Sequence, residues 1–307
     1  MVGTDGLLPV EALGIPSVWI DHNAYKRQRH KQCAFNLYTA AAMQHALAPM
    51  CRAFGDAGQA ETFDQFGRGL LRAAVRTYWS RQQALFVNNL PWLAEEKAAR
   101  TCDRSLATAI LFDQCPDSKT ENALRSLADC PPEMGFSYPA NAGWRLSALA
   151  RGGRADVIVK DLRERWATME SVKLNQTLQE DWKAAPDSGA QWSHCAVVPL
   201  NIAYYGLLGL KPLAPGFQRF ELRPQFADLA DLDLTAFTVL GPVHLRAQGP
   251  RGNREVTLRL PPGGRGELVL PQEENVELPA ASAPAPAGQR RFIMPPDSTL
   301  VLRLKHV

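Results

Sequence analysis

Residues 210–224, LKPLAPGFQRFELRP, mark the point at which the pattern of the chain changes. After this stretch, apolar and polar residues alternate in FELR (220–223), LDLTAFTV (232–239), VHLRA (243–247), VTLRL (256–260) and LVLRL (300–304). Such alternation is typical of strands with one buried face, and turn sequences such as PRGN (250–253) and PPGG (261–264) separate them. The pattern predicts an antiparallel β-sandwich over residues 211–307. We expect its inward side chains to include Phe220, Leu222, Leu234, Phe237, Val256, Leu258, Leu300 and Leu302.

Before residue 210, apolar residues recur at three- and four-residue steps, as in AFNLYTAAAMQHALAPMCRAF (34–54) and in residues 60–80. This spacing is typical of helices with one apolar face. Further candidates cover residues 104–112, 119–129, 141–151, 154–168 and 196–208, which gives about seven helices. All seven tryptophans and all six cysteines also lie before residue 210. The sequence therefore predicts two domains, a helical one over residues 1–210 and a β-domain over residues 211–307.

The composition excludes several classes of protein. Of the 307 residues, 46% are apolar and 21% charged, and the formal net charge is only +3. We therefore expect a globular chain without a nucleic-acid or membrane partner. No run of apolar residues is long enough for a transmembrane helix, and residues 1–9 lack the features of a secretory signal. A cytoplasmic location is the expectation that follows, although the amino terminus resembles a truncated one.

Motifs for metals, cofactors and common nucleophiles are missing. The six cysteines show neither C-x-x-C spacing nor a histidine at zinc-finger distance, so we expect reduced, mostly buried thiols and no metal site. The chain has no G-x-S-x-G, no phosphate-binding glycine loop and no H-E-x-x-H, and no cofactor is expected. His22, His30 and His45 fit solvated or capping roles. Cys195 follows His194 directly, and adjacent residues rarely align as nucleophile and base.

Two segments combine aromatic with titratable side chains, namely SVWIDHNAY (17–25) and the stretch from TLQEDW (177–182) to QWSHC (191–195). A carboxylate beside a tryptophan suits a sugar site, because the indole covers the C–H face of a pyranose while the carboxylate binds hydroxyls or activates water. A Glu-Asp pair ahead of a tryptophan is also typical of the charged start of a helix. From spacing alone, both interpretations stay open.

Five segments resemble the α-L-rhamnosidases of glycoside hydrolase family 78. They are WID (19–21), GFSYPANAGWRL (135–146), TLQEDW (177–182), WSH (192–194) followed by YYGLLGL (204–210), and LKPLAPGFQRFELRP (210–224). The third resembles the family's "T-T-x-W-E-x-W" segment, which carries the general base. The fifth is the most specific, since it resembles the family's junction into its C-terminal β-domain in both order and spacing.

The resemblance implies an (α/α)6 toroid followed by a β-sandwich, and inverting hydrolysis of terminal α-L-rhamnosides. Inversion places acid and base carboxyls roughly 6.5–9.5 Å apart, so that water fits between. Glu180 would be the general base, and a rhamnosylated glycoside or oligosaccharide would be the substrate. His194 would lie beside the sugar, Asp21 would bind its hydroxyls, and Trp92 in NLPWL (89–93) would stack on the ring.

Two departures from the family limit this expectation. The family's general acid lies in a "D-C-P-x-R-D-E" type segment that has no counterpart before residue 19, and DQCPD (113–117) falls too late. About seven helices also cannot complete a toroid of six helix pairs. We therefore expect the C-terminal part of a rhamnosidase, with little or no activity alone. The alternative is an inactive carbohydrate-binding or scaffold remnant.

An incomplete toroid would also leave apolar helix flanks uncovered. We expect an open amino-terminal edge formed by Val18, Ile20, Phe35, Leu37 and Tyr38. Either an upstream polypeptide or a second copy of the chain would cover it.

Overall fold

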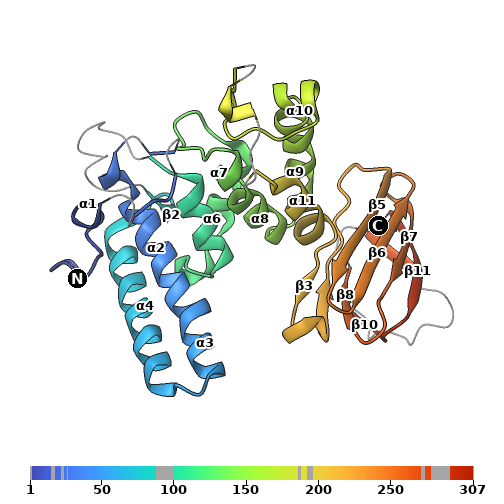
Figure 1. Ribbon diagram of the computed structural model, residues 1–307, viewed down its shortest axis with the longest axis horizontal. Coiled ribbons are helices and arrows are strands. Elements are labelled where there is room, and N and C mark those ends of the chain that lie inside the picture. Colours follow the sequence, from blue (N-terminus) through green and yellow to red (C-terminus); the bar gives the residue numbers. More distant parts are fainter. Residues whose placement is uncertain are drawn as a thin grey trace. The chain divides into compact units, whose positions relative to one another are not determined.

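The computed structural model describes residues 2–14, 18–21, 24–25, 27–87, 100–185, 188–191, 196–270, 274–277 and 291–306 (Figure 1). Contacts divide the chain into two compact units. The first combines Met1–Gly152 with Met169–Ala196, and the second combines Gly153–Thr168 with Val197–Val307. Helix gives way to strand near residue 210, but the second unit also includes helical residues before that point. The domain boundary at residue 210 stays a prediction.

The first unit is helical. Its helices are α1 (Val10–Leu13), α2 (Gln32–Ala42), α3 (Ala48–Ala53), α4 (Ala57–Tyr78), α6 (Asp103–Leu111), α7 (Glu121–Asp129), α8 (Gly143–Arg151) and α10 (Glu170–Asn175), with a short hairpin of β1 (Trp79–Ser80) and β2 (Leu85–Phe86). A π-helical turn, Met43–Leu47, joins α2 to α3. Pro49 at the start of α3 explains this turn, because proline cannot donate the backbone hydrogen bond of a regular helix.

α4 lies alongside α2 and α3 in Figure 1. Leu70 of α4 packs with Ala40 of α2 and with Leu8 in a buried cluster. The close approach of α2 and α4 depends on Gly67, since a Cβ there would lie 2.9 Å from the carbonyl oxygen of Ala40. Asp56 caps α4 by accepting the N–H of Gln59.

The expected open edge at the amino terminus is wrong for three of its five residues. Val18, Ile20 and Leu37 are buried, and Ile20 belongs to a cluster with Tyr25 and Cys102. Tyr38 is 38% exposed. The local fold covers these side chains through contacts between segments distant in sequence, which periodicity does not reveal. Association through an upstream polypeptide or a second copy stays a prediction.

The second unit contains the helical segments α9 (Ala155–Asp161) and α11 (Val198–Ile202) and two sheets. One sheet has the order β10-β8-β4-β3, formed by Arg291–Met294, Arg265–Val269, Arg219–Leu222 and Lys211–Pro212. The other has the order β5-β6-β7-β11-β9, formed by Asp231–Thr238, Gly241–Gln248, Asn253–Arg259, Thr299–His306 and Glu274–Glu277. Among the described residues, the strands of the second sheet pair antiparallel, whereas β4 of the first sheet pairs with β8 in parallel. The expectation of purely antiparallel strands is therefore wrong at this pair.

The two sheets share one hydrophobic core. It contains Phe220, Leu222 and Leu268 of one sheet and Val256, Leu258 and Leu302 of the other. Leu234 and Leu300 pack against it while partly exposed. Phe237 is 79% exposed, so its predicted inward position is wrong. Successive side chains of a strand point to opposite faces of the sheet. Because Leu234 and Ala236 of β5 face the core, Phe237 must face outward.

The described part of the chain bears on three further expectations. Five cysteines are free, and Cys33, Cys102 and Cys115 among them are buried; Cys195 lies outside the described residues. None of the helices in the described ranges is long and apolar enough to cross a membrane. Within those same ranges, no three His, Cys, Asp or Glu side chains are grouped so as to hold a metal ion.

Candidate functional site

Three segments distant in sequence meet within the first unit: residues 18–25, 135–141 and 177–182. Gly135 starts the middle segment, and its backbone pairs with the residues that open α6, where Asp103 N–H donates to the Gly135 carbonyl. A Cβ at Gly135 would lie 2.6 Å from the carbonyl oxygen of Ala24. Only glycine therefore allows the first and middle segments to approach so closely.

Asp21 joins the first segment to the middle one. Its Oδ1 accepts the N–H of Ala24 at 2.8 Å. Its Oδ2 accepts the side-chain amide of Asn141 at 3.0 Å and the N–H of Tyr138 at 3.3 Å. The Asp21 side chain is 0% exposed. These bonds fix the loop that also presents Trp19, whose ring is 48% exposed and packs edge-on against Tyr138 at 5.9 Å.

Trp182 joins the third segment to the middle one. Its Nε1–H donates to the Ser137 carbonyl at 2.8 Å, and its ring lies 5.6 Å from that of Phe136. Gln179 is buried; its Oε1 accepts the N–H of Ser171 at 3.2 Å, and its amide donates to the Asp181 carbonyl at 2.7 Å. Residues on both sides of Glu180 are therefore anchored.

Glu180 itself is half-buried, and its N–H donates to the carbonyl of Ala190 at 2.9 Å. Among the residues that the structure describes, no hydrogen bond or ion pair involves its carboxylate. The backbone of Glu180 is thus fixed, whereas its carboxylate has no partner among the described residues.

Asp103 binds the middle segment through Ser137. It is buried, and its two oxygens accept the N–H and the hydroxyl of Ser137, each at 2.8 Å. Burial raises the pKa of Asp103 to about 6, although the two hydrogen bonds from Ser137 oppose the rise. The same Ser137 accepts the indole N–H of Trp182 through its carbonyl. A chain of hydrogen bonds thus runs from Asp103 to the segment that carries Glu180.

Arg104, the neighbour of Asp103, is a buried cation on an aromatic surface. Its guanidinium lies 4.0 Å from the centroid of Trp144 and 5.3 Å from that of Tyr38. Burial lowers the pKa of Arg104. Stacking on the two rings stabilises a charge that burial would otherwise penalise.

Comparison with known proteins identifies a family model that matches part of the second unit. Residues 209–282 match the bacterial α-L-rhamnosidase C-terminal domain. No curated protein matches the sequence significantly. The match contains the whole segment LKPLAPGFQRFELRP (210–224) and starts one residue before it.

Solved α-L-rhamnosidases share the fold over nearly the whole chain. The Streptomyces avermitilis enzyme, complexed with L-rhamnose, is similar over 98% of this chain and 29% of its own, with a TM-score of 0.70 and 16% identity. The Aspergillus terreus enzyme is similar over 92% and 31%, with a TM-score of 0.68 and 15% identity. The Dictyoglumus thermophilum enzyme is similar over 96% and 35%, with a TM-score of 0.71 and 11% identity. The chain therefore resembles the C-terminal part of these rhamnosidases and spans about a third of their length.

Of the rhamnosidase-like residues expected from the sequence, the structure describes two. Asp21 and Glu180 lie on segments that both contact residues 136–141. His194 and Trp92 lie outside the described residues. Sequence reasoning missed Asp103, Ser137 and Asn141 as the residues that connect the segments. The position of Asp103 in the first turn of a helix was the one available signal.

We expect Trp182→Phe to destabilise the contact between residues 177–182 and 135–141 by removing one hydrogen bond while keeping the ring against Phe136. The Ser137 carbonyl would lose its indole donor, and the free energy of unfolding should fall by about 1 kcal/mol. Urea unfolding at neutral pH measures this. Trp79→Phe is the control, since its partly buried ring also packs on a phenylalanine in the same unit. Equal losses for the two variants would contradict a specific role for the Trp182 hydrogen bond.

Proposed function

We propose that the chain forms the base side of an α-L-rhamnosidase active site, in a partial (α/α)6 toroid followed by a β-sandwich. The reaction is inverting hydrolysis of terminal α-L-rhamnosides, with Glu180 as the general base. Asp21, His194 and Trp92 bind the sugar. The observation that carries the proposal is the half-buried Glu180 carboxylate, which has no partner among the described residues although its backbone is anchored.

The chemistry assigned to Glu180 is removal of a proton from water as that water attacks the anomeric carbon. A carboxylate already bound to an arginine or lysine would be a weaker base, because the cation stabilises its ionised form. Asp21 is assigned to sugar hydroxyls because its carboxylate oxygens are hydrogen-bond acceptors; they accept the backbone N–H groups of Ala24 and Tyr138 and the side-chain amide of Asn141. Because Asp21 is completely buried, a sugar hydroxyl reaches it only if neighbouring residues shift.

The alternative is a carbohydrate-binding protein without catalysis. One observation favours it, namely that residues 1–307 contain no counterpart of the family's acid segment. Without a general acid, a poor leaving group departs slowly even where base and sugar site are intact. Loss of general acid catalysis typically costs about 10²–10⁴-fold.

α-L-Rhamnosyl fluoride separates these two functions, because fluoride departs without being protonated. We expect the chain of residues 1–307 to hydrolyse this fluoride and to release β-L-rhamnose first, which NMR detects before mutarotation. An aryl α-L-rhamnoside should show no turnover above background. Binding of L-rhamnose without fluoride hydrolysis would favour the alternative. A first-formed α-anomer would contradict the inverting mechanism.

A further inference from the structure

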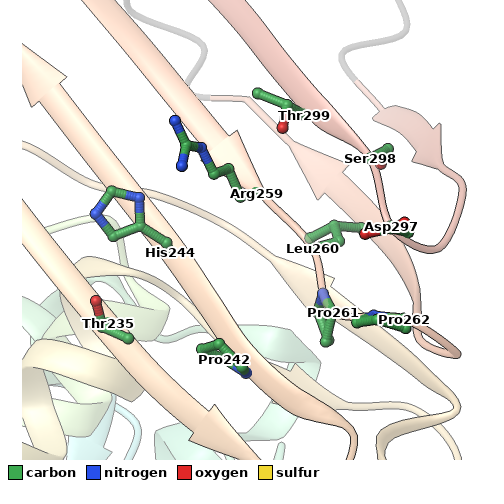
Figure 2. Close-up of a pocket in the computed structure, with 10 residues that line it drawn as sticks. All are labelled: Thr235, Pro242, His244, Arg259, Leu260, Pro261, Pro262, Asp297, Ser298 and Thr299. Atoms are coloured by element: carbon green, nitrogen blue, oxygen red, sulfur yellow. The ribbon is translucent and has the colours of Figure 1, made fainter.

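The outer face of the five-stranded sheet carries a row of four polar side chains. Backbone pairing places Thr235 of β5 opposite His244 of β6, His244 opposite Arg259 of β7, and Arg259 opposite Thr299 of β11. Residues directly opposite in an antiparallel pair lie on the same face of the sheet, so the four form a continuous row (Figure 2). With strands about 4.8 Å apart, the row spans about 14 Å.

Prolines and a tight turn enclose one side of this row. Pro242, Pro261, Pro262 and the turn residues Asp297 and Ser298 line an open pocket of about 440 Å³ with it. Two backbone hydrogen bonds fix the turn: Leu260 N–H donates to the Ser298 carbonyl at 2.9 Å, and Asp297 N–H to the Pro261 carbonyl at 3.1 Å. The rim of the pocket is therefore held in place before any ligand arrives.

Two charged side chains of the pocket, those of Arg259 and Asp297, have no ion-pair partner among the described residues. Arg259 and Asp297 are exposed, and neither forms an ion pair with any described residue. By contrast, Arg246 pairs with Asp233 at 3.3 Å on the same face of the sheet. His244 Nε2 lies 2.8 Å from the carboxylate of Asp233, which orients the ring and leaves Nδ1 for another partner. The pocket thus offers an unpaired guanidinium, an unpaired carboxylate and an oriented imidazole.

Phe237 adds an aromatic surface at the edge of the pocket. It pairs across the strands with Pro242, which lines the pocket, and lies two residues from Thr235 on the same face. Its ring is 79% exposed. A large exposed aromatic side chain adds nothing to the core of this unit, whereas it suits the C–H face of a sugar ring.

We infer that this pocket binds a neutral saccharide. The guanidinium donates to adjacent ring hydroxyls, the carboxylate of Asp297 accepts from them, and the threonine hydroxyls do both. Phe237 and the proline rings cover the apolar face of the sugar. An acidic sugar would face the repulsion of Asp297, and a free amino acid would leave Phe237 and the far end of the row unused. The inference does not depend on Glu180, which belongs to the other unit.

Titration of the full chain, followed by backbone amide NMR, tests the site with four probes: methyl α-L-rhamnopyranoside, maltose, D-glucuronate and glycine. We expect a neutral sugar to shift the amides of Thr235, Phe237 and Thr299, with a Kd on the order of 1–10 mM. Arg259→Ala should weaken binding at least about 10-fold, since it removes charge-assisted hydrogen bonds. Arg303→Ala is the matched control, because Arg303 is an exposed arginine on β11 paired with Glu255 and does not line the pocket.

Each result decides for or against the site. Binding of either neutral sugar here, lost in Arg259→Ala and kept in Arg303→Ala, supports the inference. Shifts with D-glucuronate alone or with glycine alone would overturn it, as would no shift at this face with any probe. Glu180→Gln should leave these shifts unchanged, and Arg259→Ala should leave rhamnosyl fluoride hydrolysis unchanged. Failure of this site and failure of the proposed active site are thereby distinguishable.

Discussion

Glu180→Gln should lower the hydrolysis of α-L-rhamnosyl fluoride by about 10²–10⁴-fold, the range expected for loss of a general base. Glutamine keeps the size of the side chain but cannot take a proton from water. Because only the backbone of Glu180 is bound among the described residues, the substitution should leave the fold intact. Initial rates of fluoride release, measured with a fluoride electrode, check this expectation.

Asp181→Asn is the matched control, since it removes the neighbouring, partly exposed carboxylate. If general base catalysis is confined to Glu180, this variant should keep more than about half of the wild-type rate. Glu180→Ala with added azide provides a second test. Azide needs no base, so it should displace fluoride with inversion and form the β-rhamnosyl azide. If Glu180→Gln hydrolysed the fluoride at the rate of the wild type, another group would be the base.

Much of the fold was predictable because local patterns determine it. Helices expected at residues 60–80, 104–112 and 119–129 correspond to α4, α6 and α7, with ends shifted by a few residues. The strands were equally predictable from the sequence, because each strand buries one face. Phe237 shows the limit, since LDLTAFTV (232–239) contains apolar residues at both even and odd positions. The mutual pairing of strands decides which set faces the core, and no single strand encodes it.

The candidate site was predictable only in part. Asp21 and Glu180 follow from motifs within short segments, but the connections between those segments are long-range. Asp21 and Asn141 are separated by 120 positions, and Trp182 and Ser137 by 45. Such contacts leave no periodic trace in one sequence. The buried carboxylate of Asp103 went unnoticed for the same reason, because its partner Ser137 lies 34 residues away.

The stability of the first unit should depend on pH through Asp103. Its pKa in the folded chain is about 6, raised from 3.8 chiefly by burial. The folded state therefore binds the proton more tightly than the unfolded state, and stability falls as pH rises from about 4 to above 6. A shift of roughly two units corresponds to a loss of about 3 kcal/mol. The asparagine of Asp103→Asn is uncharged throughout this pH range, so the variant should lack this loss of stability.

Urea unfolding at pH 4 and pH 8 tests this, followed by tryptophan fluorescence, since six of the seven tryptophans lie in the first unit. The difference between the two proteins is the informative quantity, because salt-bridged carboxylates such as Asp156 have lowered pKa values and act in the opposite direction. We expect the variant to lose about 3 kcal/mol less than the wild type between these pH values. Asp129→Asn, which removes an exposed carboxylate of the same unit, should follow the wild type. If Asp103→Asn also follows the wild type, Asp103 has the same pKa in the folded and the unfolded chain, and its burial does not raise the pKa.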